Sequence, residues 1–201
     1  MKALLALSRA IDAMNERIGQ SVCWLVLATV LISAGNATVR KIFNYSSNSL
    51  HEIQWYLFAM IFLFCAGYTL KHNEHVRIDI ITSRFSARVR AGIDIFGTLF
   101  FLLPMAGLIM WLSWPLFLDA YTRNEVSTNA GGLIIWPARL MVPAGFLLLI
   151  AQGLSELIKR IAFLMNLISD PHEKIITKTA EEELTDEILR ARGERAPAAI
   201  P

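Results

Sequence analysis

The sequence predicts an all-α membrane protein with four transmembrane helices, amphipathic surface helices and both termini in the cytoplasm. Although 18% of its 201 residues are charged, four stretches carry almost no charge. They are residues 18–39, 53–70, 95–118 and 126–155, the last with Arg139 as its only charge. About 20 apolar residues in a helix cross ~30 Å of hydrocarbon, so each stretch can span. Of the 19 Lys and Arg residues, 15 lie on one side of these spans, and that side is expected to be cytoplasmic.

The first twenty residues predict a short amphipathic helix at the membrane surface that runs into a span at about 22–39. Charged residues such as Arg9 and Asp12 alternate with apolar ones, as in helices that lie in the interface. The apolar run is too long for a typical signal-peptide core, and no small-residue cleavage site follows it. We therefore expect a retained helix, which Arg40 and Lys41 end.

The second span is predicted at about 53–70, after the polar loop 44–49. Glu52 stands where this helix should begin, and a carboxylate there meets the positive end of the helix dipole. Capping is thus a sufficient account of Glu52. Trp55 falls in the first turn, as aromatic residues at the membrane interface do.

The next loop predicts a basic amphipathic surface helix at about 79–90, because apolar residues recur at helical spacing between arginines. Such a helix suits an anionic membrane surface. The third span is predicted at about 93–118. Pro104 lies inside it, which predicts a kink near residues 100–104.

The fourth span is predicted at about 137–157, since Trp136 suits the interface and Pro137 suits a first helical turn. These elements form a transmembrane domain of residues 1–165. A cytoplasmic tail at 166–201 follows, partly helical or disordered.

Two charged residues in the fourth helix have predicted partners. Arg139 in its first turn can extend to the interface or pair with a loop carboxylate, either Glu125 or Asp119. At the other end, Glu156 is predicted to pair locally with Lys159 and Arg160, which follow at i+3 and i+4.

The chain carries no motif of a familiar catalytic or metal site. GxSxG, HExxH, P-loop and paired-cysteine motifs are missing from the sequence, so we expect no enzyme. Its histidines lie in loops or at helix ends, which disfavours haem ligation. His72 and His75, with Glu74 and Asp79, match no familiar zinc spacing. No cofactor and no metal are expected.

The predicted spans carry no carboxylate near their middle. Proton-coupled carriers and small exporters usually need one, because an ionisable group there couples an ion to a substrate. The chain is therefore expected not to transport anything alone.

Two sets of short motifs carry a resemblance to a known family. Over residues 15–160, their order and helix context resemble the small membrane subunit (Q type, DctQ) of tripartite ATP-independent periplasmic (TRAP) transporters. The first set is Glu52, Trp55, Gly67 and the string His75-Val76-Arg77-Ile78-Asp79; the second is Glu125-Val126-Ser127, Trp136-Pro137, Pro143, Gly145 and Phe146.

The resemblance implies a role in organic acid uptake by symport with sodium or protons. A periplasmic substrate-binding protein would capture the substrate, and a large membrane subunit would carry the substrate and ion sites. The small subunit would be a static, non-catalytic scaffold in the bacterial inner membrane. Its implied partners are those two proteins and membrane lipids, and no nucleic acid.

Carried onto this chain, the resemblance gives candidate contact surfaces. The string at 75–79 would start the cytoplasmic surface helix, with Arg77 at headgroup phosphate and Asp79 paired to it or capping. Loops 44–52 and 119–135 would receive the binding protein. The candidate contact residues are Glu52, Trp55, His75, Arg77, Asp79, Arg123, Glu125, Ser127, Trp136 and Arg139.

Two other functions stay open from the residues alone. One is a membrane anchor or assembly subunit of another complex, including a respiratory one. The other is a homo-oligomeric exporter, although the acidic coupling residue is lacking.

Overall fold

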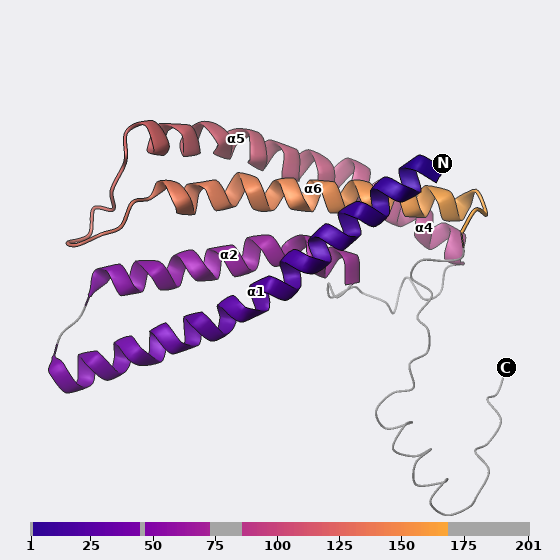
Figure 1. Cartoon of the computed structure of the whole chain (residues 1–201). Helices are drawn as coiled ribbons and strands as arrows, with labels where there is room; N and C mark the ends of the chain where they lie inside the picture. The colour runs from indigo at the N-terminus through magenta and orange to yellow at the C-terminus, as the bar shows by residue number, and fades with distance from the viewer. Residues whose placement is uncertain (1, 45–46, 73–85, 169–201) are drawn as a thin grey trace, which may run out of the picture. The chain divides into compact units, whose positions relative to one another are not determined.

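The computed structural model describes residues 2–44, 47–72 and 86–168, which are helical throughout most of their length. Four of its helices are long and apolar enough to cross a membrane, and this confirms the predicted four-span, all-α architecture. Within the described residues, the sole β-type pairing is one isolated bridge between Val126 and Ile134. The helices are α1 (Lys2–Phe43), α2 (Asn48–His72), α4 (Ala87–Gly97), η1 (Thr98–Leu102), α5 (Leu103–Thr122) and α6 (Trp136–Leu164) (Figure 1).

The first, second and fourth predicted spans lie inside α1, α2 and α6, and the third lies inside the continuous stretch formed by α4, η1 and α5; all four helical stretches extend further than predicted. The predicted surface segment at the N-terminus is helical and joins the first span without a break, giving α1 a length of 42 residues. Residues 73–85, which hold most of the predicted surface helix at 79–90, lie outside the described residues, as does the tail from 169 onward. The remainder of that predicted helix forms the first turn of α4.

The third span is one helical stretch, Ala87–Thr122, with a π-helical turn inside it. This turn, η1, occupies Thr98–Leu102 directly before Pro104. Proline has no N–H and its ring crowds the carbonyl four residues earlier, so the preceding turn commonly widens. The departure from α-helical geometry thus lies where Pro104 predicts a disturbance.

Helix α6 holds the described helices together. It packs against α2 and α5, and the N-terminal part of α1 crosses it, while the rest of α1 runs beside α2 (Figure 1). We call the end carrying Phe43 and residues 123–135 the outer end, and the opposite end the inner end, after the predicted sidedness.

Close packing of α2 and α6 depends on Gly145. A Cβ added at this position would lie 2.6 Å from the Leu63 Cβ and 3.0 Å from the Leu63 carbonyl oxygen. Small residues permit such close approach of helices in membranes.

The third span, by contrast, is little covered by the rest of the chain. In its most apolar 18-residue segment, within Ala87–Thr122, only 6% is buried, against 39% for the corresponding segment of α6. The third span therefore presents most of its apolar surface outward.

Candidate functional site

The loop between α5 and α6, residues 123–135, has a defined backbone fold at the outer end. The Ser127 N–H donates to the Leu133 carbonyl at 2.9 Å, and the Ile135 N–H donates to the Glu125 carbonyl at 3.0 Å. These paired bonds close the loop on itself like a short hairpin. We refer to residues 123–135 as the outer loop.

Glu52 on α2 anchors the outer loop. Its side chain is buried, with 4% of the residue exposed. The carboxylate accepts hydrogen bonds from the Ser127 hydroxyl, from Asn129 Nδ2 at 2.8 Å and from the Leu133 N–H at 2.6 Å. Hydrogen bonds to an ionised carboxylate are stronger than neutral ones, so this one side chain fixes three points of the loop.

The predicted helix-capping role of Glu52 does not match this geometry. Helix α2 begins four residues earlier, at Asn48, and has no acidic residue in its first turn. The predicted span begins at about Ile53, which would put Glu52 at the N-terminal end of the helix. Its carboxylate serves the outer loop instead.

Three further side chains of α2 hold the same loop, the first being Asn48, whose Nδ2 donates to the Ala130 carbonyl at 3.2 Å. The Ser49 hydroxyl donates to the Gly131 carbonyl, and the Tyr56 hydroxyl donates to the Ile134 carbonyl at 3.3 Å. Gly131 has a φ of +72°, in the left-handed region that glycine adopts without strain. The loop is therefore attached to α2 along most of its length.

An ion pair attaches the loop to α6 as well. The guanidinium of Arg139 meets Glu125 in a two-pronged contact, with Nη1–Oε2 at 2.7 Å and Nη2–Oε1 at 2.9 Å. Of the two carboxylates that the sequence left open for Arg139, Glu125 is thus a partner. Asp119 contacts Arg123, with Nε–Oδ1 at 2.7 Å.

The candidate contact residues fall into three groups. Glu52, Ser127, Glu125 and Arg139 meet at the outer loop, as described. Trp136 opens α6 and lies edge-on against Tyr121, with ring centroids 5.5 Å apart; Trp55 on α2 and Arg123 are exposed. The remaining candidates lie outside the described residues, namely His75, Arg77 and Asp79.

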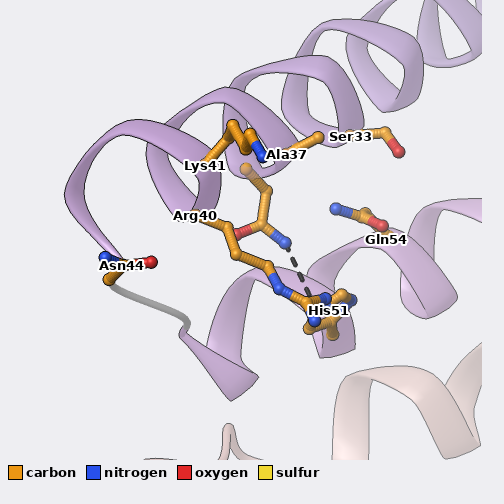
Figure 2. Close-up of a pocket in the computed structure, with 8 residues that line it drawn as sticks. Ser33, Ala37, Arg40, Lys41, Asn44, His51 and Gln54 are labelled. Atoms are coloured by element: carbon orange, nitrogen blue, oxygen red, sulfur yellow. Dashed lines mark hydrogen bonds between the residues drawn. The ribbon is translucent and has the colours of Figure 1, made fainter.

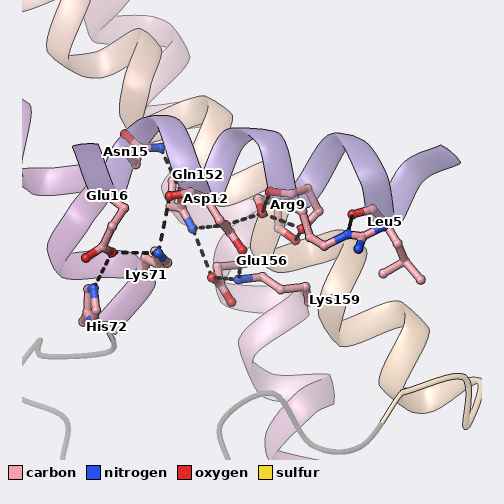
Figure 3. A network of polar contacts seen from close by, with 12 residues as sticks. Leu5, Arg9, Asp12, Asn15, Glu16, Lys71, His72, Gln152, Glu156 and Lys159 are labelled. Carbon is pink, nitrogen blue, oxygen red and sulfur yellow. Dashed lines mark hydrogen bonds and ion pairs between the residues drawn. The ribbon is translucent and has the colours of Figure 1, made fainter. Parts of the chain in front are cut away.

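A second polar cluster, which the sequence reasoning missed, joins α1 to α6 at the inner end (Figure 3). Asn15 Nδ2 donates to Gln152 Oε1 at 2.8 Å, and Gln152 Nε2 donates to Asp12 Oδ1 at 2.9 Å. Asn15 and Gln152 are both fully buried. Unpaired polar groups in such a place are costly. Asn15 Nδ2 and both polar atoms of Gln152 are paired, whereas Asn15 Oδ1 accepts no hydrogen bond from the described residues.

Further contacts involving α1 and α6 extend the cluster on either side of Gln152. Towards the N-terminus, Ser8 and Ser155 have hydroxyl oxygens 2.7 Å apart. Lys159 Nζ lies 3.1 Å from Asp12 Oδ2 and 2.5 Å from Glu156 Oε1. The last distance confirms the predicted local pair of Glu156 with Lys159.

The cluster also reaches α2 and α4. Glu16 of α1 contacts Lys71 Nζ at 2.7 Å and His72 Nε2 at 2.8 Å (Figure 3). Arg160, predicted as a local partner of Glu156, contacts Asp94 of α4 with Nη2–Oδ2 at 2.7 Å. These contacts link four helices, and we name as the inner cluster the side chains that make them: Ser8, Asp12, Asn15, Glu16, Lys71, His72, Asp94, Gln152, Ser155, Glu156, Lys159 and Arg160.

A signal for this cluster was present in the sequence. Gln152 interrupts an otherwise apolar stretch of the fourth span, and polar residues in such stretches usually face protein rather than lipid. The predicted spans lack a carboxylate near their middle, but an amide such as Gln152 can equally join two helices. Among the described residues, no group of three or more His, Cys, Asp or Glu side chains is arranged to hold a metal ion.

Comparison with known proteins gives one match. A family model described as "Tripartite ATP-independent periplasmic transporters, DctQ component" matches residues 29–163. Neither the curated proteins nor the solved structures give a match.

Proposed function

Because the chain belongs to the DctQ family, the small membrane component of TRAP transporters, we propose that it is the static scaffold of an uptake system for organic acids. In this role it anchors and stabilises a large membrane subunit in the bacterial inner membrane, and its outer loop helps to dock a periplasmic substrate-binding protein. Substrate and ion sites then lie in the large subunit.

The observation that carries the proposal is the attachment of the outer loop. Glu52 holds it to α2 by three hydrogen bonds, and Arg139 holds it to α6 by an ion pair. A docking surface that is already ordered loses little conformational freedom when its partner binds. The outer end also presents charge beside the loop, since Arg123 at the start of the loop and Asp119 in the last turn of α5 are both exposed.

The scaffold role is supported by the outward apolar surface of the third span. Side chains on it such as Phe101, Met105 and Trp111 are well exposed in the chain by itself. A surface of this kind suits lipid or a large apolar partner, and helix association in membranes rests on packing of such faces.

Gentle solubilisation of the tagged chain from native membranes, followed by mass spectrometry of what co-purifies, tests the assembly. We expect a much larger multi-helix protein in roughly equal amount. Recovery of the chain as a homo-oligomer alone, or together with redox subunits, would contradict the proposal and favour an exporter or a membrane anchor of another complex.

Charge reversal on the outer loop tests docking separately. Arg123→Glu is expected to lower uptake without lowering co-purification of the large subunit, because Arg123 is exposed and its ion pair is with the nearby Asp119 of α5. Arg9→Glu is a matched control, since Arg9 is exposed at the inner end and contacts the Leu5 carbonyl. Unchanged uptake kinetics in Arg123→Glu would rule out this part of the loop.

A further inference from the structure

A basic cavity lies between the outer ends of α1 and α2, apart from the outer loop and the inner cluster. Its volume is about 610 Å³, within the range of pockets that hold small ligands. Arg40 and Lys41 of α1 and His51 of α2 line it, and Figure 2 shows the Arg40 side chain reaching from α1 towards His51. None of the residues that line it is acidic.

The cations of this cavity have no carboxylate partner among the described residues. Neither Arg40 nor Lys41 forms an ion pair there. Glu52, which follows His51 in sequence, is occupied by the outer loop. Two neighbouring cations without a counter-charge favour an anion, and a guanidinium and an ammonium are both good phosphate donors.

Two buried polar atoms at the cavity also lack partners. Gln54 Nε2, a donor, and Asn36 Oδ1, an acceptor, form no hydrogen bond with any of the described residues. Asn36 is only 6% exposed, and its Nδ2 donates to His51 Nε2 at 3.4 Å. Leaving such groups unpaired is costly. Because the terminal torsion of an amide side chain is soft, a small rotation brings either atom to a ligand.

Apolar side chains lead away from the cavity along both helices. On α1, Val30 and Val26 precede the lining residue Ser33 by three and seven positions, and both are exposed. On α2, Phe58 and Phe62 follow Gln54 by four and eight positions and are 60% and 79% exposed. These spacings keep each row on one helix face. A lipid whose polar headgroup occupied the cavity would place its acyl chains along these two rows.

We propose that this cavity binds the phosphate-bearing headgroup of a phospholipid from the leaflet at the outer end. Phosphate oxygens accept from Arg40, Lys41 and Gln54 Nε2, and a headgroup hydroxyl or ammonium donates to Asn36 Oδ1. A free phosphate compound shares the headgroup chemistry, but it leaves the apolar rows unused. The inference does not depend on the organic acid or on the docking role proposed above.

Native mass spectrometry of the full chain, purified with whatever partners accompany it, tests the site. The probes are phosphatidylglycerol and phosphatidylethanolamine, with glycerol 3-phosphate and inorganic phosphate as headgroup compounds without acyl chains. The variant Arg40→Gln/Lys41→Gln should retain about tenfold less phospholipid, as expected for the loss of charge-assisted bonds. Gln54→Leu should show a smaller loss, because it removes one neutral donor.

Arg123→Gln serves as the matched control, since it removes another exposed cation at the same end, and it should retain phospholipid as the parent chain does. Equal retention in all variants would overturn the site. Full displacement of the lipid by glycerol 3-phosphate or inorganic phosphate would show that the cavity binds a free phosphate compound rather than a phospholipid. Carbodiimide cross-linking of Lys41 to an acidic side chain of a partner would instead assign the cavity to protein.

Discussion

The amide groups of Asn15 on α1 and Gln152 on α6 form a direct hydrogen bond of 2.8 Å, although 137 residues separate them in the sequence. Both side chains are fully buried. The bond helps to fix where α1 crosses α6, because an offset of one helical position on either side would separate the buried Asn15 Nδ2 donor from its Gln152 Oε1 acceptor.

This contact predicts energetic coupling between α1 and α6. Asn15→Ala and Gln152→Ala should each destabilise the chain, and the double variant should lose less than the sum of the two. A coupling of about 0.5–2 kcal/mol is expected for an interhelical hydrogen bond in a membrane protein. Unfolding by SDS titration in mixed micelles measures it, with the exposed Gln20→Ala as a control that should change little. Strict additivity would contradict the role of the bond.

Removal of the Glu52 carboxylate should release the outer loop. In Glu52→Ala, three donors of the loop lose their acceptor, and one of them is the Leu133 amide, which bonds to Glu52 Oε2. Hydrogen exchange at Leu133 should rise by about tenfold or more, since bonds to charged groups contribute about 1.5–3 kcal/mol. Exchange at Ala106, buried in α5, is an internal reference. Unchanged protection at Leu133 would show that Glu52 does not hold the loop.

Close approach of α2 and α6 predicts a penalty for any side chain at Gly145. Gly145→Ala places a methyl group 2.6 Å from the Leu63 Cβ, and the overpacking should cost about 1–3 kcal/mol. Gly107→Ala is the matched control, because a Cβ there has no atom within 4 Å, and alanine favours the helix. Thermal unfolding of the purified chain compares the two. A Gly145→Ala variant as stable as Gly107→Ala would be inconsistent with this packing.

A charge swap tests the ion pair that joins the outer loop to α6. Arg139→Glu and Glu125→Arg should each increase cleavage of the loop by protease, because each sets like charges against one another. The double variant should recover much of the resistance. The ion pair should contribute a modest free energy, about 1 kcal/mol or less, because both side chains are about one-third exposed. A double variant no better than the singles would show that the pair does not order the loop.

The number and order of the spans could be predicted from stretches almost without charge, because recognising 18 or more mainly apolar residues in a row requires no knowledge of their partners. The pairing of Arg139 with Glu125 could also be predicted, because the two residues are close in the sequence: one lies in a short loop and the other in the first turn of the helix that follows. Glu52 was misread for a local reason. Its role depends on Ser127, Asn129 and Leu133, more than 70 residues away, and nothing in the nearby sequence distinguishes an anchoring carboxylate from a capping one.

The inner cluster was missed for a different reason. Asp12, Asn15 and Glu16 fall in a segment whose alternating charges suit a membrane surface, and this pattern is the same whether its polar face meets water or another helix. Only the crossing of α1 over α6 turns that face inward, where it meets Gln152 and Ser155. Helix crossings follow from packing of the whole chain, which a single sequence does not specify.

Helix α1 carries the inner cluster near one end and the basic cavity near the other. At 1.5 Å per residue, its 42 residues extend about 63 Å, roughly twice the ~30 Å hydrocarbon thickness. The helix contains no proline, the usual cause of a sharp bend. One unbroken helix therefore connects the inner cluster to the basic cavity, so contacts that hold its N-terminal half against α6 also help to set where Arg40 and Lys41 lie at the opposite end.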